Sequence, residues 1–118
     1  MKLTRLKFNK IGVYIIKIFK NERPFKNLLA YFLMLTGLSQ FITIHRKNYK
    51  IRFYPTSLSK LYFLKKNARL AEEKLLEEYL NPGDIYVDVG ANIGALALKA
   101  SSLVKETGRV IAFEPHPK

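Results

Sequence analysis

Residues 86–117, YVDVGANIGALALKASSLVKETGRVIAFEPHP, constrain the fold more than any other part of this chain of 118 residues. Ile85–Val89 is a short apolar run between a Pro-Gly turn and Gly90, which favours a buried parallel strand over a helix. Apolar residues then recur at helical spacing over residues 93–104, and Arg109–Phe113 is a second apolar run. This order predicts a right-handed βαβ unit with two parallel strands, and therefore an α/β fold.

The predicted unit brings acidic and small residues to one edge of its sheet. Asp88 lies at the carboxyl end of the first strand, and Glu114 directly follows the second. Open α/β sheets bind ligands at this edge, where the loops diverge. Gly90 allows a sharp turn, Gly94 allows a close approach to the start of the helix, and Asn92 is the predicted helix cap. Glu114 can accept two hydrogen bonds from a ribose diol.

The glycine turn differs from the one that binds dinucleotides. When G-x-G-x-x-G is aligned from Gly90, its second glycine falls on Asn92 and its third on Ala95. The close approach that a pyrophosphate needs is therefore not provided, and a nucleoside ligand without a pyrophosphate fits better. The alternative is a βαβ packing unit whose glycines serve only the turn.

The segments VDVGANIG and GRVIAFEPHP together resemble the first two motifs of S-adenosylmethionine-dependent methyltransferases, and the FkbM family in particular, which shares a D-x-G-A-N-x-G turn and an F-E-P ending. The two motifs cover about the last 35 residues. The resemblance implies a Rossmann-like class I sheet and O-methyl transfer to a small molecule or glycan. It implies that the methionine part of S-adenosylmethionine lies among Asp88, Gly90, Ala91 and Asn92, with Gly94 in the same turn and Glu114 on the ribose hydroxyls. No catalytic residue is assigned.

Methyltransferases of this class have a larger sheet than two strands, whereas this sequence stops shortly after Phe113. A parallel pair alone would keep an unpaired edge and an uncovered face. We therefore interpret the sequence as the amino-terminal portion of a larger enzyme, with a truncated reading frame as the preferred explanation. The adenine pocket and the acceptor site are expected in the missing carboxyl-terminal part, so the chain alone is expected to be inactive.

Positive charge is concentrated in the amino-terminal half. The net charge is +12, and residues 1–60 hold 13 lysines and arginines against Glu22 alone, while residues 61–118 hold eight residues of each sign. A helix over residues 3–20 would carry an apolar face opposite lysines and arginines, a pattern that can bind an anionic membrane surface. An ordinary surface helix covering the catalytic domain fits equally well. Phosphate contacts to nucleic acid are less favoured, because the lysines are interleaved with a large apolar face.

The chain divides into a helical region over residues 1–40 and a hairpin, helix and truncated methyltransferase domain over residues 41–118. Leu28–Leu35 is apolar all round but falls short of the roughly 20 residues of a spanning helix, which favours a buried or membrane-seated helix over a spanning one. Lys17 and Lys20 interrupt any signal-peptide pattern. The absence of cysteine is consistent with a cytoplasmic protein, peripheral to a membrane if the basic helix binds lipid.

The second region is predicted to begin with a hairpin over residues 41–54, followed by a helix that Asn67 caps. The glutamates of that helix are expected to form its solvated side, and Lys99 is expected to point away from the packed face of the following helix. We predict no metal site, since no histidine or aspartate accompanies the glutamates.

The chain contains two histidines, which are the candidates for a general base. His45 is predicted to lie on a strand surface, and His116 is a loop residue that could lie over an adenine edge but more simply has no role. Neither has a nucleophile at a meaningful spacing, so no general base is assigned. Two other function classes stay open, a nucleic-acid binder or methyltransferase and a non-catalytic membrane-associated fragment.

Overall fold

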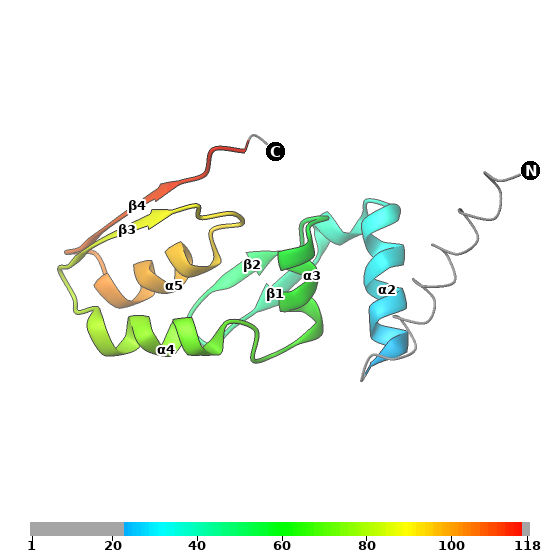
Figure 1. Ribbon diagram of the computed structural model, residues 1–118, viewed down its shortest axis with the longest axis horizontal. Coiled ribbons are helices and arrows are strands. Elements are labelled where there is room, and N and C mark those ends of the chain that lie inside the picture. The colour runs from blue at the N-terminus through cyan, green and yellow to red at the C-terminus, as the bar shows by residue number, and fades with distance from the viewer. Residues whose placement is uncertain (1–22, 117–118) are drawn as a thin grey trace, which may run out of the picture.

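The computed structural model describes residues 23–116, which form a mixed α/β structure with two small sheets (Figure 1). Its elements follow the chain in this order: α2 (Pro24–Leu35), the 3-10 helix η1 (Leu38–Phe41), β1 (Thr43–His45), β2 (Lys50–Arg52), α3 (Ser57–Leu64), α4 (Leu70–Tyr79), β3 (Ile85–Val89), α5 (Ala95–Val104) and β4 (Arg109–Phe113). The predicted helix over residues 3–20 lies outside the described residues.

Strands β3 and β4 pair in parallel, with α5 connecting them, as the sequence predicted. Their register places Asp88 opposite Ala112 and Val89 opposite Phe113. The helix begins at Ala95, later than the predicted start near Ile93. Figure 1 shows α5 and α4 on the same side of the strand pair, with α5 next to the sheet.

The other face of the β3–β4 pair is apolar and open to solvent within the described part of the chain. Ile85, Val87 and Val89 alternate along β3 on this face, and Ile85 and Val89 keep 67% and 82% of their surface exposed. Phe113 adds a further exposed side chain from β4. Parallel sheets are normally covered on both faces. The exposed side chains on β3 and β4 therefore confirm the prediction that one face of this strand pair is uncovered.

A hydrophobic core of the described residues lies between the hairpin and the helices beside it. Strands β1 and β2 pair antiparallel, which confirms the hairpin with shorter strands than predicted. The core joins the hairpin and α3 to the start of α5 and comprises Tyr49, Ile51, Tyr62, Ala68 and Ala95. Ile93, from the loop before α5, packs against it. The hairpin therefore supports the segment that follows the glycine turn.

Helix α2 presents one side to the rest of the described structure and leaves the other side exposed. Asn27 and Ala30 are buried, whereas the exposed side is apolar and includes Phe25, Leu28, Leu29, Phe32 and Leu35. Pro24 occupies the first turn, where its missing N–H costs no helical hydrogen bond. Among residues 23–116, no helix is long and apolar enough to cross a bilayer.

Both predicted helix caps are wrong. The cap of α4 is Arg69, in the left-handed region at φ 54°, and the cap of α5 is Gly94 at φ 76°. Asn67 and Asn92 precede these residues, and neither helix has a side-chain cap. In each case a left-handed residue redirects the chain into the helix, so the asparagine lies outside the first turn and its side chain does not reach the unpaired N–H groups.

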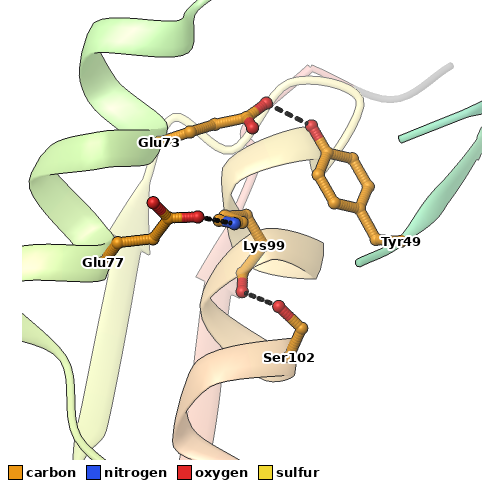
Figure 2. A network of polar contacts seen from close by, with 5 residues as sticks. All are labelled: Tyr49, Glu73, Glu77, Lys99 and Ser102. Atoms are coloured by element: carbon orange, nitrogen blue, oxygen red, sulfur yellow. Dashed lines mark hydrogen bonds and ion pairs between the residues drawn. The ribbon is translucent and has the colours of Figure 1, made fainter. Parts of the chain in front are cut away.

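A buried lysine joins α4 to α5 (Figure 2). The Lys99 side chain is 2% exposed, and its Nζ lies 2.5 Å from Oε1 of Glu77. In the same network, the Tyr49 hydroxyl donates a hydrogen bond of 2.6 Å to Glu73. Glu77 and Glu78 are exposed, as predicted for the solvated side of α4. The prediction that Lys99 points away from the packed face is wrong. The reason is that α5 contacts both the sheet and α4, so a second side of this helix is covered.

Candidate functional site

The glycine turn after β3 is tied to the end of β4 by backbone hydrogen bonds. The N–H groups of Gly90 and Ala91 donate to the carbonyl oxygen of Phe113, at 2.8 and 3.0 Å. Gly90 adopts φ 80°, in the left-handed region that favours glycine. Asn92 also has a positive φ of 54°, so the turn reverses the chain within a few residues. The carboxyl ends of the two strands and the turn therefore form one connected edge.

Glu114 lies at this edge and contacts the turn directly. Its Oε2 accepts a hydrogen bond of 2.7 Å from the N–H of Asn92, and its Oε1 accepts one of 3.0 Å from the N–H of His116. The prediction that Glu114 emerges at the carboxyl ends of the two adjacent strands is thus confirmed. Two backbone donors therefore fix the direction of the carboxylate.

Asp88 has a buried carboxylate oxygen without a partner. The residue is 9% exposed, and its Oδ2 has no hydrogen bond among the described residues. A buried charged acceptor without a donor is costly, and such groups in native proteins call for an explanation. Burial raises the pKa of the neighbouring Tyr86, and the Asp88 charge raises this pKa further. The oxygen is available to accept a hydrogen bond from water or from a ligand.

Space beside the turn distinguishes its glycines from a packing glycine elsewhere. A Cβ added at Gly90 or Gly94 would meet no atom within 4 Å. A Cβ at Gly108 would lie only 2.4 Å from the Cβ of Val104. Gly90 and Gly94 thus border open space that a ligand can enter, whereas Gly108 is required by close packing. The open turn and the unpartnered Asp88 oxygen fit a cationic, hydrogen-bonding ligand.

Other side chains of the site region add little chemistry. His116 is exposed after β4 and contributes its backbone N–H to Glu114, while His45 lies on the exposed side of β1. No group of three or more metal-binding side chains occurs within residues 23–116.

Sequence reasoning did not identify two supports of the turn. One is the carbonyl oxygen of Phe113, which accepts from both N–H groups at the start of the turn. The other is the hairpin core, which packs against Ile93 and contains Ala95. The carbonyl has no sequence signal, because every residue carries one. The apolar character of Ile93 was visible, but its partner in a distant hairpin was not.

Comparison with known proteins found no matching family model, curated protein or solved structure. The functional assignment therefore depends on the residues at the carboxyl edge of β3 and β4.

Proposed function

We propose that this chain carries the cofactor-binding start of a Rossmann-like, FkbM-type methyltransferase and binds S-adenosylmethionine at the carboxyl edge of β3 and β4. The observation that carries the proposal is the buried, unpartnered Oδ2 of Asp88 beside an open glycine turn. The methionine part of the cofactor carries an ammonium group, which supplies the kind of charged donor that this oxygen lacks.

Different residues of this edge would contact different parts of the cofactor. Asp88 would hold the ammonium end, and Gly90 and Gly94 would leave room for the chain of the methionine part. Ala91 and Asn92 line the same turn. Glu114 would accept the ribose hydroxyls, in a direction that its two backbone hydrogen bonds already set. The ribose assignment rests on the family resemblance and on the position of Glu114 at this edge.

The cofactor, when bound, supplies an electrophilic methyl group, so the protein contributes mainly alignment of the acceptor with that group. We assign no residue between 23 and 116 to acceptor binding, and the acceptor class, a small molecule or glycan, follows from the resemblance alone. The apolar face of β3 and β4 is expected to be covered in an active enzyme. We therefore expect the 118-residue chain to bind the cofactor weakly and to transfer no methyl group.

Nuclear magnetic resonance of the ¹⁵N-labelled chain can test this site at low affinity. Titration with S-adenosylhomocysteine, the stable product form of the cofactor, should shift the amide signals of Gly90, Asn92 and Gly94. Asp88→Ala should abolish these shifts, because the ligand ammonium would lose its carboxylate partner. The matched control is Asp84→Asn, which removes a carboxylate from the opposite end of β3.

Three results would count against the proposal. One is an absence of shifts at the turn up to the solubility limit of the ligand. Another is equal binding by the parent chain and by Asp88→Ala. The third is a stronger response to NAD than to S-adenosylhomocysteine, which would indicate a dinucleotide site despite the missing glycines. Micromolar affinity would confirm the site but refute the expectation that the edge is incomplete.

A further inference from the structure

A basic pocket lies between α2 and α3, separate from the glycine turn. It has a volume of about 640 Å³ and is lined by residues from the start of α2, from one side of α3 and from the loop after α3. Four of the lining residues carry a positive charge, namely Arg23, Lys60, Lys65 and Lys66. None of the lining residues is acidic.

The surroundings strengthen the positive potential of this pocket. Residues 23–71 contain ten lysines and arginines and no aspartate or glutamate. A concave surface lined by one sign of charge focuses the field and raises the local concentration of the opposite ion. The pocket is therefore suited to an anion.

Two contacts hold parts of the lining in place. The Arg46 guanidinium donates hydrogen bonds to the carbonyl oxygens of Lys65 and Lys66, which fixes the backbone of the loop after α3. Lys60 donates a hydrogen bond of 2.8 Å to the Tyr31 hydroxyl, and its Nζ lies 3.9 Å from the centre of the Tyr31 ring. The backbone at Lys65 and Lys66 and the side chain of Lys60 are thus held in place by contacts within the protein.

Asn27 supplies a second, independent sign of a ligand. This lining residue is 5% exposed, and its buried Oδ1 has no hydrogen-bond partner among residues 23–116. Ser57 adds a hydroxyl to the same pocket. Buried amides are normally paired, and Oδ1 only accepts hydrogen bonds, so the missing partner of Asn27 is a donor, which a hydroxyl of the ligand would supply rather than its phosphate. Fixed cations beside amide and hydroxyl groups are the combination that binds a phosphate with hydroxyls attached to it.

The apolar side of α2 favours a phospholipid in a bilayer over a free phosphate compound as the ligand. Phe25 lies between Arg23 and Asn27 in sequence and keeps 83% of its surface exposed. Phe32 and Leu35 continue the exposed apolar surface along the helix. A free phosphate compound would use the cations alone, whereas a bilayer surface uses both the cations and the apolar side chains. We propose that the pocket binds the phosphate headgroup of an anionic phospholipid while the exposed side chains of α2 enter the acyl boundary.

Vesicle cosedimentation of the whole chain tests this proposal. The chain should bind mixed phosphatidylcholine–phosphatidylglycerol vesicles and should bind pure phosphatidylcholine far less. Lys65→Gln with Lys66→Gln should lower the partition coefficient about 30-fold, since each basic residue near an anionic surface contributes roughly a five-fold factor. The matched control, Lys47→Gln with Lys50→Gln, removes the same charge from exposed hairpin positions outside the pocket, and should lower it less than the pocket variant.

A second variant separates the headgroup from the acyl boundary. Phe25→Ser should weaken vesicle binding but should leave the shift of the Asn27 side-chain amide by glycerol 1-phosphate unchanged. Equal vesicle binding by the pocket and control variants would overturn the proposal, because membrane affinity would then come from another surface. Glycerol 1-phosphate binding without vesicle binding would indicate a soluble ligand. Loss of RNA binding in the pocket variant, with vesicle binding unchanged, would assign the pocket to nucleic acid.

Discussion

Gly90→Ala tests the glycine turn, because the added methyl group should affect both the stability of the chain and its binding of ligand. Gly90 adopts φ 80°, and an added Cβ would meet no atom of the protein within 4 Å. The substitution therefore introduces backbone strain without a clash in the ligand-free chain. The same Cβ would stand in the open space that we assign to the methionine part of S-adenosylmethionine. Stability and ligand binding should consequently respond by different amounts.

The stability cost of Gly90→Ala can be worked out from its conformation. A left-handed conformation costs an alanine roughly 1–2 kcal/mol, and the lower entropy of the unfolded chain offsets about 0.4–1 kcal/mol of this. The net loss should be about 1 kcal/mol. Gly83→Ala is the matched control, since Gly83 has φ 96° and its Cβ would make an ordinary contact of 3.7 Å with Thr107. It should destabilise the chain by a similar amount at the other end of β3.

The two alanine variants should differ in ligand binding. Inserting a methyl group into a fitted contact costs about 1–3 kcal/mol, which corresponds to a loss of affinity of roughly fivefold to 150-fold. Urea denaturation measures the stability of each variant, and the amide shifts of Asn92 measure binding of S-adenosylhomocysteine. Gly90→Ala should remove the shifts, and Gly83→Ala should keep them. Unchanged shifts in Gly90→Ala would show that the ligand does not approach the turn.

Two further predictions concern the helices behind the sheet. Gly108→Ala should destabilise the chain by about 1–3 kcal/mol or more, as measured by urea denaturation. The reason is that the added Cβ would lie 2.4 Å from the side chain of Val104 and under 3.0 Å from two backbone oxygens. A loss of stability under about 0.5 kcal/mol would refute this packing. The hydrogen bond from Lys99 lowers the pKa of Glu77 from 4.5, so its stabilising effect should be present above pH 4.5 and be lost as the pH falls through the lowered pKa. The stability difference between the parent and Glu77→Gln should therefore shrink at acidic pH.

The parallel strand pair could be predicted because its signals are local. Ile85–Val89 and Arg109–Phe113 are apolar runs of strand length, and a glycine turn and one apolar helix separate them. The right-handed connection then leaves only one parallel arrangement, which places Asp88 and Glu114 at the same edge. Chain direction and spacing alone therefore account for this part of the site.

Lys99 shows where local reasoning stops. Periodicity places a charged residue on the solvent side of an isolated amphipathic helix, and α5 packs on the sheet as expected. The helix also packs against α4, however, and this second contact depends on the path of the chain before β3. Glu77 then neutralises a lysine that would otherwise be an unpaired buried charge. No pattern within α5 indicates that partner, because it comes from another helix.

The structure also connects the amino-terminal part of the described chain to the glycine turn. The hairpin core contains Ala95, the first residue of α5, and Ile93 packs against it. On the other side, the turn is bonded to Phe113 and Glu114 at the end of β4. A change in the hairpin can therefore displace the turn without touching the ligand. We therefore expect the geometry of the glycine turn to depend on the hairpin that precedes it in the sequence.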